Sequence, residues 1–138
     1  MHSLCDIGDN NATLGNYKDF SGNIIPNSWY KKITTNTGKP DLNSIAILAE
    51  VVYWYRPSKD GTTKFKGDVW QTSYDHFEKK FGFNREAIRR IFVKLEQLKI
   101  LTREFRTIEH RGHRYNNILF LHLNSEKLFS EAAGEGKK

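Results

Sequence analysis

Cysteine is almost absent from this chain of 138 residues, since Cys5 is the only one. A single cysteine excludes an intrachain disulfide and a thiolate metal cluster. Long apolar runs are missing as well, and none approaches the roughly 18 residues of a membrane span. The first residues, MHSLCDIGDN, lack the basic-then-apolar order of a secretory signal. These absences predict a cytoplasmic protein with no membrane partner.

Catalytic signatures are also missing. The sequence has no glycine-rich phosphate loop, no nucleophile elbow and no convincing pair of carboxylates. One metal-site alternative uses Glu109, His110 and His113. Two histidines three residues apart in a turn suit a metal less well than an i, i+4 pair on a helix, and no fourth ligand is evident nearby. The sequence therefore predicts a protein that is not an enzyme and that needs neither a metal nor a cofactor.

The residues that are present describe one globular domain. Its content of 38% hydrophobic and 13% aromatic residues is enough to fill a single core. Residues 1–24 are rich in Asn, Gly and Asp and predict a flexible leader. Residues 25–129 form the predicted domain, and residues 130–138 a flexible polar tail.

Positive charge is concentrated in one quarter of the chain. The net charge is +6, but from Lys79 to Arg114 eleven Lys and Arg oppose only four Glu, so this stretch carries +7 and the remainder −1. Such a concentration is typical of a site for a polyanion, although position in the sequence does not place the charges on one face.

A first helix is expected at residues 42–55. Asp41, after a proline, is expected to act as its N-cap. The segment RPSKDG then ends the helix, and a short strand is expected at residues 69–71. The helical spacing of the apolar residues supports the assignment: Ile45, Leu48, Ala49 and Val52.

Two further helices are expected on either side of a tight turn. Thr72 and Ser73 can both cap the first helix, at residues 74–81, and Thr72 with Asp75 approximates a capping box. Gly82 permits a left-handed turn, and Asn84 can cap the second helix, at residues 85–98. Residues 98–100, LKI, contain no glycine that could take a left-handed conformation, so the second helix is expected to end less sharply. Its apolar stripe predicts a buried face made of Ile88, Ile91, Phe92, Leu95 and Leu98.

A β-hairpin is expected after these helices. Residues 100–110 alternate in the manner of a strand, HRGH at residues 110–113 supplies a turn, and RYNNILFLHL favours a second strand. Asn124 can then cap a short last helix.

The order of these elements resembles the winged helix-turn-helix family. The stretch VWQTSYDHFEKKFGFNREAIRRIFVKLEQLKILTREFR is similar to the core pattern of that family, and the resemblance covers roughly residues 26–123. In character it is most similar to the DNA-binding domains of plasmid or phage replication initiators and replisome organisers. The resemblance implies an α+β fold with a three-helix core, a short strand and a C-terminal hairpin called the wing. It also implies a role in replication initiation or transcriptional regulation, and association with the nucleoid if the chain is bacterial.

Double-stranded DNA is the partner that the resemblance implies. The recognition helix at residues 84–98 would enter the major groove, where arginine can donate two hydrogen bonds to guanine. The wing tip at residues 110–114 would contact the flanking backbone or the minor groove. The expected DNA contacts are Ser73, Tyr74, Lys79, Lys80, Asn84, Arg85, Arg89, Arg90, Lys94, Arg111, His113 and Arg114.

Two alternatives stay open from the sequence. The arginines of the basic helix can be solvated charges, with Glu86 pairing with Arg89 or Arg90, and the domain then serves as a protein–protein interaction module without direct DNA contact. The aromatic residues at 53–55 cannot all face one core, so a homodimer interface is also considered. A twofold dimer would read two half-sites.

Overall fold

The computed structural model describes residues 21–128, so residues 1–20 of the predicted leader, residue 129 of the predicted domain and the predicted tail at residues 130–138 lie outside the described residues. Among those described, no helix is both long and apolar enough to cross a bilayer. The predicted α+β class is confirmed. The elements are α2 (Trp29–Lys32), α3 (Leu42–Tyr55), β1 (Trp70–Thr72), α4 (Tyr74–Phe81), α5 (Arg85–Gln97), β2 (Leu101–His110) and β3 (His113–Leu123).

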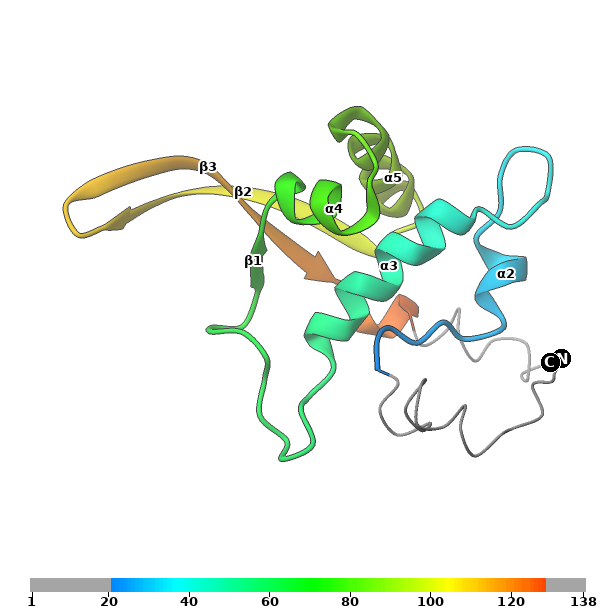
Figure 1. Cartoon of the computed structure of the whole chain (residues 1–138), viewed down its shortest axis with the longest axis horizontal. Coiled ribbons are helices and arrows are strands. Elements are labelled where there is room, and N and C mark those ends of the chain that lie inside the picture. The colour runs from blue at the N-terminus through cyan, green and yellow to red at the C-terminus, as the bar shows by residue number, and fades with distance from the viewer. Residues whose placement is uncertain (1–20, 129–138) are drawn as a thin grey trace, which may run out of the picture.

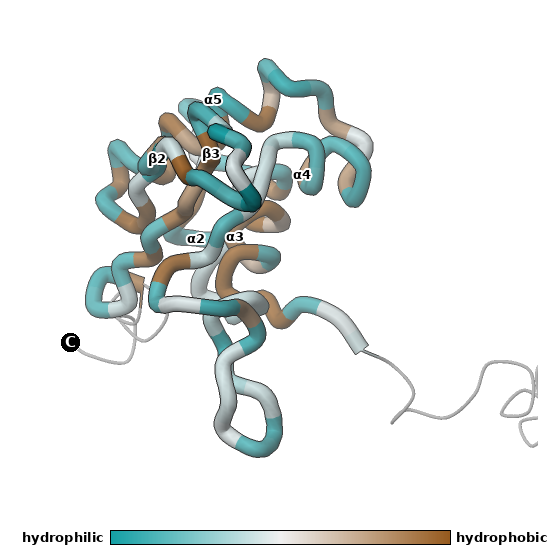
Figure 2. Tube along the Cα trace, turned by 90° about the vertical axis from the view of Figure 1, so that its left-hand side faces the viewer, coloured by the Kyte–Doolittle hydropathy of each residue, from teal (hydrophilic) through white to brown (hydrophobic). Residues whose placement is uncertain are grey.

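The three strands form one antiparallel sheet in the order β1-β3-β2. β3 is therefore the central strand, and the short strand β1 pairs with its second half, with Thr72 opposite Leu119. Beyond that pairing, β2 and β3 continue as a two-stranded arm that extends away from the helices, on the left of Figure 1. Figure 2 looks at the molecule from that side and shows mainly hydrophilic colours over the arm.

A bulge and a tight turn shape the arm. The pairing register shifts between Arg106 and Ile108, and on the opposite strand Asn117 has a positive φ of 58°. At the end of the arm, Arg111 and Gly112 both have positive φ, 54° and 80°. Two successive positive φ values define the type I′ turn, whose twist matches that of a two-stranded ribbon. The turn expected at HRGH is therefore confirmed.

The core lies between the helices and one face of the sheet. Large side chains from the helices and from the sheet are almost fully buried there, including Trp29, Phe77, Phe92 and Leu121. Neighbouring residues of a strand point to opposite faces, so Phe120 lies on the other side of the sheet. The guanidinium of Arg106 covers its ring at 4.1 Å from the centroid.

Helix α3 begins as its sequence signal predicts. The side chain of Asp41 accepts a hydrogen bond from the backbone N–H of Ser44, and the helix ends at Tyr55. The hydroxyl of Tyr55 then lies between two strands, where it accepts a hydrogen bond from Trp70 N and donates one to the carbonyl of Leu121. This hydroxyl fastens the end of α3 to the β1–β3 pair.

The turn between α4 and α5 is also the predicted one, with one correction. Gly82 has a φ of 78°, and Asn84 caps α5 by accepting from the N–H of Ala87. Of the two expected caps of α4, Ser73 is confirmed, since its hydroxyl accepts from His76 N, and the capping box at Thr72 is wrong. Thr72 instead belongs to β1, because its backbone pairs with Leu119.

Helix α5 ends more sharply than its sequence predicts. Lys99 has a φ of 67°, although the left-handed region usually favours glycine. The N–H groups of Lys99 and Ile100 bond to the carbonyls of Glu96 and Leu95, which is the Schellman arrangement. Ile100 and Leu95 are both fully buried, and the helix ends at this point because the left-handed turn at Lys99 brings Ile100 into the core.

Candidate nucleic-acid interface

The outer face of α5 carries three exposed arginines. The side chains of Arg85, Arg89 and Arg90 are 63%, 48% and 71% exposed. Arg89 and Arg90 share one acidic partner, Glu86, with shortest distances of 2.6 and 3.3 Å. The pairing of Glu86 that the sequence offered as an alternative is thus present in the free protein.

The acidic partner of these arginines is held ionised. Hydrogen bonds from Arg89 and then Arg90 lower the pKa of Glu86 to about 2. Ion pairs at this degree of exposure contribute little to stability, because water screens them and the side chains lose entropy. The arginines can therefore exchange Glu86 for a phosphate or a base edge at small cost.

Arg85 faces the hairpin from the first turn of α5. Its guanidinium lies 5.3 Å from the centroid of the Tyr74 ring, and its Nε donates to Glu78 at 3.1 Å. Tyr74 is itself held from the other side, because its hydroxyl accepts a hydrogen bond from Arg103 on β2. Arg103 also forms a bidentate salt bridge with Glu96 of α5, in which its Nη2 and Nε donate to the two carboxylate oxygens at 2.9 and 3.0 Å. This network positions the predicted contact residues Tyr74 and Arg85 against β2.

Two of the predicted contact residues have structural partners instead. Lys94 points toward the start of α3, where its ammonium contacts Asp41 and the carbonyl of Thr34. Lys80 lies 2.8 Å from Glu50, a carboxylate whose side chain is only 1% exposed. Both placements favour a role in holding the helices together over the predicted DNA contact.

The other predicted residues of α4 remain near its accessible surface. Lys79 is 79% exposed and pairs with Asp75 at 3.1 Å, one turn earlier. Ser73 caps the helix with its hydroxyl. Of these two, Lys79 keeps an ammonium that a phosphate can reach, while the Ser73 hydroxyl is already committed to the backbone of His76.

The end of the arm holds the remaining predicted contacts. Arg111, His113 and Arg114 are exposed, and within residues 21–128 neither arginine has a salt-bridge partner. The His113 ring packs against Tyr115 at 6.4 Å between centroids. In the described part of the chain no three His, Cys, Asp or Glu residues are grouped as a metal site would need. In the described part of the chain, the arm thus presents at its tip two arginines without a salt bridge, of which Arg114 lies opposite Glu109 in the strand register.

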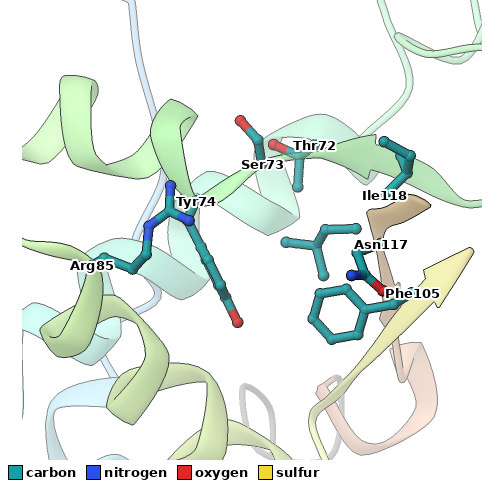
Figure 3. Close-up of a pocket in the computed structure, with 8 residues that line it drawn as sticks. Thr72, Ser73, Tyr74, Arg85, Phe105, Asn117 and Ile118 are labelled. Atoms are coloured by element: carbon teal, nitrogen blue, oxygen red, sulfur yellow. The ribbon is translucent and has the colours of Figure 1, made fainter. Parts of the chain in front are cut away.

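A hollow of about 280 Å³ lies between the helices and the arm. Figure 3 shows Arg85 and Tyr74 on one side, with Phe105, Asn117 and Ile118 across from them. The lining comprises Thr72, Ser73, Tyr74, Arg85, Phe105, Asn117, Ile118 and Leu119. The first turn of α5 and the root of the arm therefore belong to one continuous surface.

Two features of this region were not predicted. Phe105 and Asn117 line the hollow, although sequence reasoning assigned them only to strands. Phe105 occupies an inward position of β2 yet is 49% exposed. The signals that point to them are a large aromatic residue within a basic strand, and the Asn-Asn pair that marks the bulge.

The carboxylate of Glu50 is the second unpredicted feature. It accepts hydrogen bonds from Asn23, Trp54 and His76 and pairs with Lys80. Burial raises its pKa, but these four donors together lower it to about 2. Asn23, placed in the predicted leader, is thereby attached to the domain. No local pattern in the sequence marks a contact between residues this far apart.

Comparisons with protein families, with curated proteins and with solved structures found no match to this chain.

Proposed function

We propose that this chain is a DNA-binding module of the winged-helix type. In this proposal α4, the Gly82 turn and α5 are the helix-turn-helix, α3 completes the three-helix core, and the outer β2–β3 arm is the wing. One observation carries the proposal: Arg85 of α5 lines the same hollow as Phe105 and Asn117 of the arm. A helix and a wing that share one surface can contact neighbouring parts of one duplex.

The recognition helix supplies the contacts that read sequence. Arg85 and Arg89 are four residues apart and lie on the same side of α5, so both can reach into a major groove. Each can donate two hydrogen bonds to guanine O6 and N7, while Arg90, about 100° around the helix, is directed to the backbone. Asn84 caps α5 with its side chain, so it contributes mainly by orienting the first turn.

The wing supplies contacts to the flanking DNA. Arg111 and Arg114 stand at the end of an arm that reaches beyond the helices, and both lack acidic partners within residues 21–128. Arginine is favoured at the minor groove and at phosphates, where the potential of DNA is most negative. The module then serves replication initiation or transcriptional regulation, in the cytoplasm or at the nucleoid.

A second candidate function is a winged helix that binds an acidic protein and not DNA. It is favoured by one observation: the arginines of α5 are all paired with glutamates in the free chain. Under this alternative, Glu78 and Glu86 keep the outer face of α5 close to neutral, and the interaction uses the arm or the α3 surface.

The test compares binding of a duplex by the wild type and by the double variant Arg85→Ala/Arg89→Ala. Lys31→Ala/Lys32→Ala is the matched control, because it removes the same charge from α2, away from the hollow. Fluorescence anisotropy with a mixed-sequence duplex at low and moderate salt is the measurement. We expect at least about a tenfold loss in the arginine variant and little change in the control, with circular dichroism unchanged. Equal binding by all three proteins would overturn the assignment of α5 as the recognition helix, and no duplex binding by any of them would favour the protein-interaction alternative.

Salt dependence tests the proposed phosphate contacts separately. Each phosphate that a cation neutralises contributes about 0.9 to the slope of log affinity against log salt. Replacing Arg90 and Lys79 by alanine should reduce this slope by about one unit each if they contact phosphates, with an equal effect on every DNA sequence. An unchanged slope would remove those two residues from the interface.

A further inference from the structure

The hollow between α5 and the arm is lined by the exposed ring of Phe105, a flat apolar surface on which another ring can stack. Phe105 points to the helix-facing side of the sheet, the same side as its pairing partner Leu119. Leu119 is 4% exposed, whereas Phe105 is 49% exposed, because the helices stop covering the sheet at this point. A phosphate needs donors and positive charge, so an exposed phenyl ring at this place contributes nothing to it.

Phe105 is the aromatic surface of the hollow that is free to stack. The Tyr74 ring is already packed against Phe92, at 5.7 Å between centroids, and it carries the Arg85 guanidinium at 5.3 Å. Within residues 21–128, Phe105 has no aromatic or cationic neighbour of this kind. A ligand ring can therefore lie on Phe105 without displacing an existing contact.

Asn117 places a primary amide beside that ring. Its left-handed φ of 58° belongs to the bulge, and Figure 3 shows its amide next to Phe105. Among the described residues no hydrogen bond to this amide is formed. An amide offers two N–H donors and one carbonyl acceptor, the set that the edge of a nucleobase complements. The hollow thus combines a stacking surface with an unused hydrogen-bonding group.

We propose that this hollow receives one unpaired base of single-stranded or locally opened DNA. The base stacks on Phe105, its edge meets the Asn117 amide, and its phosphate lies near Arg85, whose side chain is 63% exposed at the rim. A base within an intact duplex has both faces covered by its neighbours, so only an unpaired base can occupy the hollow. The volume of about 280 Å³ lies at the lower end of ligand pockets, in agreement with a single ring system. This inference rests on the proposed function, since it takes DNA as the ligand.

Three variants separate the parts of the proposal. Phe105→Ala removes the stacking surface, and Phe105→Leu keeps apolar bulk without an aromatic face. Asn117→Gly removes the amide while glycine accepts the positive φ of the bulge. Tyr115→Ala is the matched control, because Tyr115 is an aromatic residue of the same arm, 44% exposed, that does not line the hollow. Thermal unfolding of each variant checks that the fold is retained.

The measurement is anisotropy with a single-stranded oligonucleotide and with a duplex of the same sequence. A single 2-aminopurine in the single strand reports stacking directly through its fluorescence. We expect Phe105→Ala to weaken single-strand binding by about 5- to 100-fold and to abolish the 2-aminopurine change. Phe105→Leu should lose most of the same affinity, and Asn117→Gly about 2- to 10-fold. Duplex affinity should stay within about twofold in every variant.

The contrary outcomes are distinct. Equal weakening of single-strand and duplex binding in Phe105→Ala would place the hollow under the duplex backbone and overturn the inference. Unchanged single-strand binding in Phe105→Ala, or equal loss in Tyr115→Ala, would overturn it as well. In these cases, duplex binding that depends on Arg85 and Arg89 leaves the proposed function standing. No binding of either DNA by the wild type removes both proposals.

Discussion

The ammonium of Lys94 lies 2.5 Å from the carboxylate of Asp41, the residue that caps α3. The contact joins the last turn of α5 to the start of α3, and both side chains are mostly shielded from solvent, at 28% and 21% exposed. Burial raises the pKa of Asp41, but the hydrogen bonds from Lys94 and Ser44 outweigh it and hold the pKa below its ordinary value. The Asp41 carboxylate therefore has two roles: it caps α3, and it links α3 to α5 through Lys94.

Lys94→Ala is expected to affect stability and not DNA affinity. Its removal leaves the Asp41 carboxylate and the Thr34 carbonyl without their shared donor, which should cost about 1–2 kcal/mol in the free energy of unfolding. Urea unfolding gives the stability, and duplex anisotropy gives the affinity. A variant of unchanged stability that loses several-fold in affinity would restore Lys94 to the DNA interface.

The ionisation of Glu50 should make the domain sensitive to acid. Its pKa in the folded chain, about 2, is below the ordinary value of 4.5, so the folded state is stabilised by the charged form. That contribution is complete above about pH 4.5 and is lost as the pH falls toward 2, with a total of roughly 3 kcal/mol. Urea unfolding between neutral and acidic pH measures it.

Two glutamine variants isolate this effect. Glu50→Gln should lower stability at neutral pH by roughly 2–4 kcal/mol, because Lys80 loses its partner, and should flatten the acid dependence. Glu86→Gln is the control, since the pKa of Glu86 is also lowered to about 2 but its pairs are exposed and screened. Similar losses in the two variants would show that burial of Glu50 is not the cause.

Lys99→Gly is expected to stabilise the domain. Lys99 ends α5 with a φ of 67°, a conformation that costs a residue with a Cβ roughly 1–2 kcal/mol. Glycine avoids this cost but loses more entropy on folding, so the net gain should be about 0.5–1 kcal/mol. Lys99→Ala keeps the strain and should be nearly neutral. Thermal and urea unfolding would show the difference, and a glycine variant no more stable than alanine would contradict it.

Arg111→Asn separates the charge of the wing tip from its turn. Asparagine is favoured where a type I′ turn needs positive φ, so the hairpin should be kept or slightly stabilised. If Arg111 contacts a phosphate, the slope of log affinity against log salt should fall by about 0.9. Anisotropy over a salt series measures the slope. A variant with the wild-type slope would place the turn outside the DNA contact.

Local signals predicted much of the fold. Asp41 and Asn84 as caps, Gly82 as the left-handed turn and the turn at Gly112 are all confirmed, because each depends on a few adjacent residues. The predictions that were wrong concern residues whose conformation depends on contacts with distant parts of the chain. Lys99 takes a glycine-like conformation because Ile100 must be buried. Thr72 is drawn into β1 by pairing with a strand more than forty residues later.

The candidate site was less predictable than the fold. The apolar stripe of residues 85–98 left Lys94 outside the buried face, but it did not show that Asp41 of α3 lies beside this lysine. Nor did any sequence pattern place Lys80 beside Glu50. Phe105 was assigned only to a strand, and only the tertiary structure shows that it faces the helices and stays half-exposed. The spacing of residues along a helix or strand predicts the face on which a side chain lies. The residue that it contacts depends on how the elements pack together.

The strand order has a consequence for how the hollow can change. β1 has three residues and lies at the edge of the sheet, so its bonds to β3 are among those that open most readily. Thr72, its last residue, is part of the rim of the hollow, and Tyr55 secures its first. Fraying of this short ladder would widen the hollow while the β2–β3 arm stayed paired. A ligand bound in the hollow should therefore slow hydrogen exchange of the backbone amides of β1 more than that of the amides in the helices.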